Sequence, residues 1–380
     1  MNFFNFIIWS ANPEIFPNID WLPIRWYGLL FALGFVFSQQ LMYYIFKAEG
    51  KTTKDVDILT LFMIVATILG ARLGHVMFYE PLRYLKDPIS ILKTWEGGLA
   101  SHGAAIGIMT GIWLYVNYHI DINPFKMRFI WRKSKKEGQS FFWVSDRIVI
   151  MVALTGALIR FGNYINAEII GIPTRTNSGV VFARDVIDVL EYMPQVEKVQ
   201  IKKDKDNKVD ESGFVPVQII IDFDPKVNNS KLAGTIVSTN VKTRLSSYEY
   251  VTMHIHEPFS HPIRFEIKKI KNNSFRAIIK TKAIPRHPAQ LYESVSTFLL
   301  FLLLLAIWYK TKEKTPEGRL FGIFMVVLFT LRFFYEFIKE NQVTFEDNLP
   351  LNMGQWLSIP LVLLGIYILV YQKRFQPKNS

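Results

Sequence analysis

The 380-residue sequence contains no cysteine. This absence excludes disulfide bonds, a thiolate nucleophile and a thiolate metal site from the chain. The segment from Met1 to Pro23 has no lysine, no arginine and no Ala-x-Ala cleavage pattern, so we expect no removable signal peptide. An internal repeat, which is common in transporters, is also missing from the sequence.

Apolar residues, by contrast, are abundant. Half of the residues are hydrophobic, 15% are aromatic and the mean hydropathy is positive. A soluble chain of this length rarely has such a composition, so the sequence predicts an integral membrane protein. The net charge of +12 could suggest nucleic acid, but in a membrane protein lysine and arginine collect in cytoplasmic loops that face anionic lipid. We therefore expect no nucleic-acid partner.

Seven segments approach the length of about 20 apolar residues that a bilayer crossing requires. They are residues 24–46, 57–79, 99–119, 142–163, 288–309, 319–338 and 353–371. The connectors after the first, third, fifth and seventh segments hold 16 lysines and arginines, whereas the short connectors of the opposite side hold four. By the positive-inside rule, the N-terminus is expected outside the cytoplasm and the C-terminus inside it.

The fourth apolar segment ends in a polar cluster. Between Leu158 and Gly171 the sequence carries an arginine, two asparagines and a glutamate within nine residues. An arginine at the centre of a spanning helix costs about 2.5 to 3.5 kcal/mol, so polar groups at membrane depth indicate a functional site. The alternative is that Arg160 extends to the lipid headgroups.

In this topology every apolar segment places polar residues in the outer leaflet. They are Arg25, Tyr27, Arg72, His75, His102, Arg160, Asn163, Gln290, Glu293, Arg332, Glu336, Asn352 and Gln355. A transporter would instead place its site near the bilayer midplane. The shared leaflet therefore favours one site with access from the outer leaflet.

Two local patterns leave alternatives open. Arg332 and Glu336 are four residues apart, so they share a helix face and form either a bundle-stabilising ion pair or part of a site. Around His102, small residues at three- and four-residue spacing either let helices approach closely or leave room for a ligand. His102 itself is either a hydrogen-bonded packing residue or a base.

Residues 184–283 have a different character. A short helix is predicted at 186–192, followed by β-rich runs at 196–202, 215–223, 234–241, 248–256, 265–270 and 275–281. The tetrapeptide Lys271 to Ser274 indicates a hairpin between the last two runs. The predicted fold is an all-α polytopic membrane bundle of about seven transmembrane helices with an inserted, mostly β extracytoplasmic domain. Its parts are a membrane domain at 1–183, the insert at 184–283 and further membrane helices at 284–380.

Several motifs together resemble one family. The stretch Arg160-Phe161-Gly162-Asn163-Tyr164-Ile165-Asn166-Ala167-Glu168-Ile169-Ile170-Gly171 is similar to the signature of the bacterial prolipoprotein diacylglyceryl transferases. So are RWYG at 25–28, GARLG at 70–74, GGLASHG at 97–103, RHPAQLYE at 286–293, RFFYE at 332–336 and MGQ at 353–355. The resemblance covers all seven segments in order. Two features depart from the expected pattern: segment 184–283 is longer than the expected connector, and Leu328 stands where many members carry a tyrosine.

The resemblance implies a transferase of the bacterial cytoplasmic (inner) membrane that acts in lipoprotein biosynthesis. It would move the diacylglyceryl group of phosphatidylglycerol to the sulfur of the lipobox cysteine of a preprolipoprotein, forming a thioether and releasing glycerol 1-phosphate. These two substrates are the expected partners, and neither a cofactor nor a metal is expected. A free cysteine has a pKa of about 8.5, so its thiol gains from a nearby base or from cations.

The resemblance also assigns roles by motif. His102 is the expected general base, Arg160 and Arg332 are expected to bind phosphate, and Glu336 to hold Arg332. The expected phosphatidylglycerol-binding residues are Arg160, Tyr27, Asn163, Glu168, Gly171, Glu293 and Arg72. Asn163 would bond the glycerol headgroup and Tyr27 the phosphate, with helix packing as the alternative for both. Gly171 would act through backbone geometry, and Arg72 either orients neighbouring groups or binds a headgroup.

Two other functions are compatible with the residues. A lipid or anion carrier would bind headgroups through the arginines without covalent chemistry, and it would tolerate the loss of His102. A membrane scaffold would present residues 184–283 to a partner, and it would lose its function when that segment is deleted. The motifs argue against the carrier, and the shared leaflet of His, Arg and Glu argues against the scaffold.

Overall fold

The structure is a computed structural model that describes residues 6–17, 19, 21, 24–93, 98, 100–123, 128–133, 136–204, 209–270, 274–340 and 349–374. Gly97 and Leu99 of the third motif and Lys271–Asn273 of the predicted hairpin lie outside these residues. The chain forms two compact units. The sheet unit comprises Met1–Phe31, Leu158–Val295 and Arg332–Trp356, and the bundle unit comprises Ala32–Ala157, Ser296–Leu331 and Leu357–Ser380.

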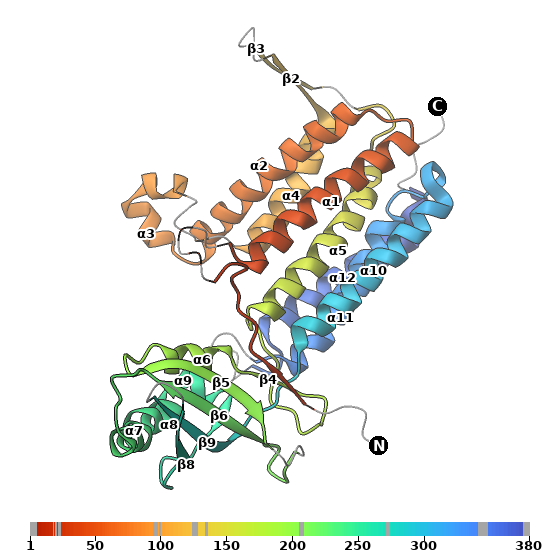
Figure 1. Ribbon diagram of the computed structural model, residues 1–380. Coiled ribbons are helices and arrows are strands. Elements are labelled where there is room, and N and C mark those ends of the chain that lie inside the picture. The colour runs from red at the N-terminus through yellow and green to blue at the C-terminus, as the bar shows by residue number, and fades with distance from the viewer. Residues whose placement is uncertain are drawn as a thin grey trace. The chain divides into compact units, whose positions relative to one another are not determined.

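Each of the seven predicted apolar segments contains a helix. They are α1 (Trp26–Ala48), α2 (Thr53–Phe78), α4 (Ser101–Asn117), α5 (Phe141–Ile165), α10 (Ala289–Thr311), α11 (Arg319–Tyr335) and α12 (Met353–Tyr371). Within the bundle unit they run alongside one another (Figure 1). Six helices of the described residues are long and apolar enough to cross a membrane, and the 17-residue α4 is not among them. The chain is therefore a polytopic membrane protein.

Helices α2 and α4 approach each other along a row of glycines. A Cβ atom on Gly103 would lie 2.3 Å from the carbonyl oxygen of Gly70, and one on Gly107 would lie 2.1 Å from that of Ala66. Only glycine fits such backbone contacts. Close helix approach is thus confirmed as one role of the small residues. An apolar groove of about 670 Å³ also runs along these two helices.

The core of the bundle unit contains charged side chains that were not predicted from the sequence. Arg147 on α5 pairs with Glu49, which follows α1, with Nη2 and Oε2 2.7 Å apart. Glu49 also accepts a hydrogen bond from the indole of Trp308 on α10. Asp146 accepts hydrogen bonds from two backbone N–H groups near the start of α11, both at 2.8 Å. Since Arg147, Glu49 and Asp146 are buried, each depends on these partners to offset its lost hydration.

The sheet unit is built around a five-stranded antiparallel sheet. Its strands are β5 (Val196–Lys203), β6 (Val215–Phe223), β7 (Ile255–His256), β8 (Arg264–Lys269) and β9 (Phe275–Ala283). The order is β5-β6-β9-β7, with β8 also paired to β9. Every second residue of β6 and β9 is buried, because alternate side chains point to the same core. The β8–β9 pairing confirms the predicted hairpin.

Four short helices accompany the sheet: α6 (Arg184–Glu191), α7 (Ser230–Ile236), α8 (Lys242–Ser247) and α9 (Glu249–Thr252). A π-helical turn at Val237–Val241 continues α7. The strands predicted at 234–241 and over most of 248–256 are therefore wrong. Asn229 caps α7, and the buried residues that follow it recur at helical spacing, so capping and tertiary packing outweigh the β propensity of valine and isoleucine. The segment is a mixture of helix and strand, not mostly β.

The N-terminal segment joins the same core. Strand β1 (Ile7–Trp9) pairs in parallel with β4 (Val180–Phe182), and Phe6 is completely buried in the core formed by the sheet and its helices. The bundle unit has a further hairpin, not predicted from the sequence, formed by β2 (Tyr118–Asn123) and β3 (Arg128–Lys133). A short helix, α3 (Pro81–Lys86), follows α2 (Figure 1).

Loss of one partner of the Glu49–Arg147 pair should leave the other charge buried and uncompensated. Glu49→Gln is therefore expected to destabilise the protein by about 3 to 5 kcal/mol. The measurement is the apparent thermal midpoint of the purified protein in detergent. The double variant E49Q/R147M should regain part of the loss, because it removes both charges; a double variant with the summed loss of the two single changes would contradict this coupling. Asp57→Asn, which alters an exposed contact with Tyr43, is the control.

Candidate functional site

Glu293 joins two cations of the sheet unit. Its carboxylate on α10 pairs with Arg160 on α5, with Oε2 and Nε 2.7 Å apart, and with the ammonium of Lys339, which follows α11. The side chains of Lys339 and Glu293 are only 6% and 9% exposed. A buried charge that loses its partner is strongly destabilising, so Glu293 and Lys339 require each other in this position.

Glu336 joins the same lysine to a second arginine. Nε of Arg332 lies 3.7 Å from Oε1 of Glu336, and Nζ of Lys339 lies 3.3 Å from that oxygen. Asn352 donates to the other carboxylate oxygen at 3.1 Å. Gly354 on α12 makes room for the carboxylate, because a Cβ there would lie 2.6 Å from its carbon. The guanidinium side chain of Arg332, in contrast, is 42% exposed.

The loop after α5 holds Glu168 in a strained turn. The carboxylate of Glu168 accepts hydrogen bonds from the amides of Asn163 and Asn166, each at 3.1 Å. Asn163 accepts a longer hydrogen bond from Arg160, at 3.5 Å. Both neighbours of Glu168 have a φ of 56°. For the β-branched Ile169 this conformation costs of order 1 to 3 kcal/mol and persists only where the surroundings impose it.

Two buried acceptor oxygens in this part of the site have no partner among the described residues. One is Oε1 of Gln290, whose Nε2 donates to the carbonyl of Glu168, and the other is Oδ1 of Asn166. Buried polar atoms are nearly always satisfied in folded proteins. Each of these oxygens can accept a hydrogen bond from a hydroxyl group.

Gly171 lies where three backbone segments meet. Its N–H donates to the carbonyl of His287 at 3.1 Å, and the N–H of Ile172 donates to that of Ile338 at 3.0 Å. A Cβ on Gly171 would lie 2.4 Å from the first carbonyl oxygen and 2.7 Å from the second. Close approach, and not a positive φ, therefore explains the glycine. The same segment forms an antiparallel bridge with Lys339 and so fixes where that lysine lies.

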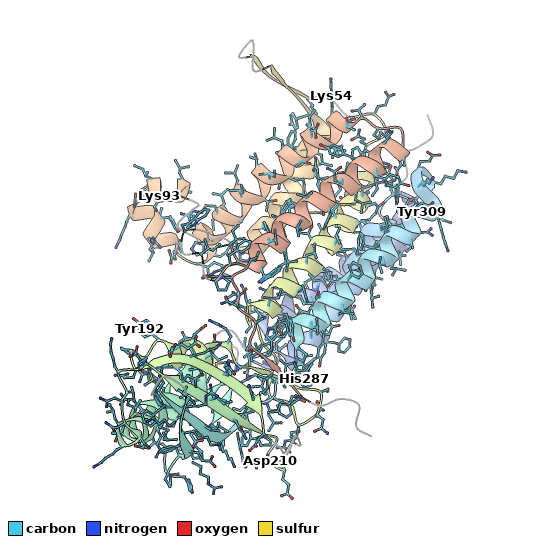
Figure 2. The ribbon with its side chains drawn as sticks, viewed as in Figure 1. Lys54, Lys93, Tyr192, Asp210, His287 and Tyr309 are labelled. Carbon is cyan, nitrogen blue, oxygen red and sulfur yellow. The ribbon has the colours of Figure 1, made fainter. Side chains whose placement is uncertain are left out.

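His287 lies just before α10 and is labelled in Figure 2. Partial burial lowers the pKa of His287 below its ordinary value, because the charged imidazolium loses solvation. Its ring makes an edge-on contact with that of Tyr292, with centroids 6.3 Å apart. At neutral pH the uncharged ring is therefore favoured.

Tyr27 packs against the end of α5. A Cβ on Gly162 would lie 3.0 Å from the Tyr27 ring, so the missing side chain gives the ring its place. The ring also stacks on Phe31, with centroids 6.4 Å apart. These contacts hold Tyr27 beside the helical turn that carries Arg160 and Asn163.

Arg72 is buried on α2 in the bundle unit, and its guanidinium binds backbone. It donates to the carbonyls of Ile91 at 2.9 Å, Lys93 at 3.1 Å and Gly98 at 3.3 Å, and also to that of Ser90. A guanidinium has five N–H donors, and these contacts use most of them. The geometry favours the alternative in which Arg72 orients the neighbouring chain.

His102 lies in the first turn of α4, also in the bundle unit. Its ring contacts those of Phe78 and Tyr79 at the end of α2, with centroids 5.1 and 5.8 Å away. The ring of His75 also stacks on that of Tyr79, with centroids 5.4 Å apart. Aromatic packing therefore fixes the plane of the His102 ring.

The sheet unit brings together eight of the predicted site residues: Tyr27, Arg160, Asn163, Glu168, Gly171, Glu293, Arg332 and Glu336. Arg72 and His102 belong to the bundle unit. Lys339 is not among the site residues predicted from the sequence, where it appears only as a connector charge. Its position three residues after Glu336 was the available signal, because side chains at that spacing share a helix face.

Comparisons with known proteins agree with the motifs. The family model described as prolipoprotein diacylglyceryl transferase matches residues 14–371. Three similar proteins are named phosphatidylglycerol–prolipoprotein diacylglyceryl transferase. The protein of Tolumonas auensis is 33% identical to this chain, and the match covers 96% of both chains. The protein of Chloroherpeton thalassium is 32% identical, and the match covers 97% of this chain and 94% of the relative. The protein of Bacteroides fragilis is 29% identical, and the match covers 96% of this chain and 95% of the relative.

These relatives match over nearly their whole length, so the expectation that segment 184–283 is unusually long does not hold for them. The match includes the loop after α5, the start of α10 and the end of α11, which carry the ion-pair network. Sequence match and site geometry lead to the same conclusion: the chain belongs to the prolipoprotein diacylglyceryl transferase family.

Proposed function

We propose that the chain transfers the diacylglyceryl group of phosphatidylglycerol to the sulfur of the lipobox cysteine of preprolipoproteins. Its family and the names of its relatives, which specify phosphatidylglycerol and prolipoprotein, support this activity. The observation that carries the proposal is the chain of contacts from Arg160 through Glu293, Lys339 and Glu336 to Arg332. It holds two guanidinium groups on different helices, and guanidinium binds phosphate bidentately.

The reaction requires substitution at the glycerol carbon that carries the phosphate. The cysteine sulfur forms a C–S bond, the C–O bond to phosphate breaks, and glycerol 1-phosphate leaves with the electron pair. The thiol proton passes to a base, for which we propose His102. Arg160 and Arg332 stabilise the negative charge that grows on the leaving phosphate, and fixed cations lower the barrier because they need no reorganisation.

The remaining residues bind the lipid. Asn163 and Glu168, with the buried oxygens of Asn166 and Gln290, offer acceptors that suit the hydroxyl groups of the glycerol headgroup. Tyr27 is proposed to donate to the phosphate. Gly171 keeps the backbone segments together, and Arg72 orients the chain at residues 90–93 and at Gly98. The apolar groove along α2 and α4 suits acyl chains.

The proposed topology has seven membrane crossings, namely the six long apolar helices and, in addition, α4. The N-terminus is extracytoplasmic and the C-terminus cytoplasmic, as the 16 and four basic residues of the two sets of connectors favour. Residues 184–283 then form an extracytoplasmic insert between membrane parts at 1–183 and 284–380.

A carrier of lipids or anions would use the same arginines without making a bond. The relatives' names favour the transferase over this alternative. Transfer to a cysteine peptide also distinguishes the two directly, because a carrier forms no thioether.

Arg160→Ala should lower kcat/KM for transfer by about 100-fold or more, since it removes a cation from the developing charge. The measurement is transfer of labelled glycerol from phosphatidylglycerol to a lipobox peptide by the purified protein. A peptide with serine in place of cysteine is the substrate control and should stay unlabelled. If folded wild-type protein transfers nothing in its own lipid, the transferase proposal is wrong.

His102→Gln should lower kcat by about 100-fold with little change in KM for the lipid, as expected of a general base. His261→Gln, an exposed histidine of the insert, is the matched control and should behave like wild type. Full activity of the His102 variant would assign the base role to another group.

We further propose that the insert binds the extended part of the preprolipoprotein. Lys202, Lys280 and Arg264 are exposed and lie in one cross-strand row of the sheet, where Lys280 and Arg264 are direct neighbours. Like charges in such a pair repel each other, so an acidic polypeptide segment placed over the row would relieve the repulsion.

The double change Lys280→Glu and Arg264→Glu should raise KM for a full-length preprolipoprotein about tenfold and leave that for a short lipobox peptide unchanged. Lys226→Glu, outside the row, provides the charge control. An equal effect on both substrates, or none on either, would show that the row does not bind the substrate.

A further inference from the structure

Lys339 is the centre of the ion-pair network, although no motif includes it. Its ammonium contacts both Glu293 and Glu336, and through them it links to Arg160 and Arg332. Its side chain is 6% exposed, the lowest fraction of the five. A lysine buried so deeply has to be paired, and here two carboxylates share one ammonium group.

The network has an uneven charge balance. Three cations and two carboxylates leave a formal surplus of one positive charge among groups in direct ionic contact. Glu168 is linked to Arg160 through the neutral amide of Asn163. A phosphodiester such as that of phosphatidylglycerol carries one negative charge. The surplus therefore matches one phosphate.

Exposure places the surplus on the arginines. Arg332 and Arg160 are 42% and 28% exposed, whereas the lysine and the carboxylates lie behind them. If Lys339 were neutral, each carboxylate would be balanced by its arginine alone, and the network would carry no surplus. Phosphate would then compete with Glu293 and Glu336 for the same guanidinium groups.

We propose that Lys339 is a positioning residue that neutralises Glu293 and Glu336 and so leaves Arg160 and Arg332 available to the lipid phosphate. The inference rests on the proposed function. It predicts a change in lipid affinity and not only in folding, because the role of Lys339 lies in the charge balance.

Lys339→Met should raise KM for phosphatidylglycerol about 10- to 100-fold, the size of effect expected for a weakened charge-assisted contact. Lys339→Arg keeps the charge and should restore KM to within about threefold of wild type. The double variant E293Q/K339M has two cations and one carboxylate, so it regains the surplus and should bind the lipid more tightly than K339M. A purely structural lysine predicts the opposite order, because the double change disturbs packing further.

Equilibrium binding of short-chain phosphatidylglycerol to the same purified proteins measures the anion site without the chemistry. Absence of transfer by wild type would count against the proposed function alone, whereas the order of binding among the variants tests the role of Lys339 separately. Lys282→Met, which breaks the 2.7 Å pair with Asp210 in the same unit, is the matched control. If K339M does not fold, Lys339→Gln makes the same change of charge. An unchanged affinity in the folded neutral variant, or a double variant weaker than the single one, would overturn the proposal.

Discussion

The charge of Lys339, buried between two carboxylates, is the constraint on which the candidate site depends. Charges removed from water are tolerated only when opposite charges meet them at close range. The sheet unit satisfies this condition with an alternating series, cation to anion, that starts on α5, passes through α10 and ends on α11. The series fixes two guanidinium groups without burying them, which gives the proposed phosphate site both rigidity and access.

The backbone around the network is shaped by residues that have little or no side chain. Gly171 allows its own segment to approach those at 287 and 338, and Gly354 allows α12 to approach Glu336. The φ of 56° at Ile169 shows the cost of the turn that presents Glu168. Strain of this kind persists where surrounding contacts impose it, and it is typical of functional sites. The proposed headgroup site therefore depends on backbone packing as much as on its polar side chains.

The bundle unit follows the same electrostatic rule for a different purpose. Arg147 pairs with Glu49, which also accepts a hydrogen bond from Trp308, and both charged side chains are fully or almost fully buried. Unlike Arg160 and Arg332, Arg147 has no exposed surface with which to bind a ligand. Exposure, more than charge, separates an arginine that stabilises the fold from one that can take part in chemistry.

The sequence by itself determined the membrane class, the positions of the helices and the family, because apolar length and motif order are properties of local sequence. It also predicted four strands of the insert within two residues of their observed limits, where alternation is regular. The prediction of a strand at 234–241 failed, because β-branched residues lie on a capped helix there. Tertiary burial decides between helix and strand for such residues. Only the tertiary structure revealed Lys339 as the shared partner of Glu293 and Glu336 and showed that Arg72 binds backbone carbonyls. Residues that are far apart in the chain come into contact through tertiary packing, and local sequence does not specify which of them meet.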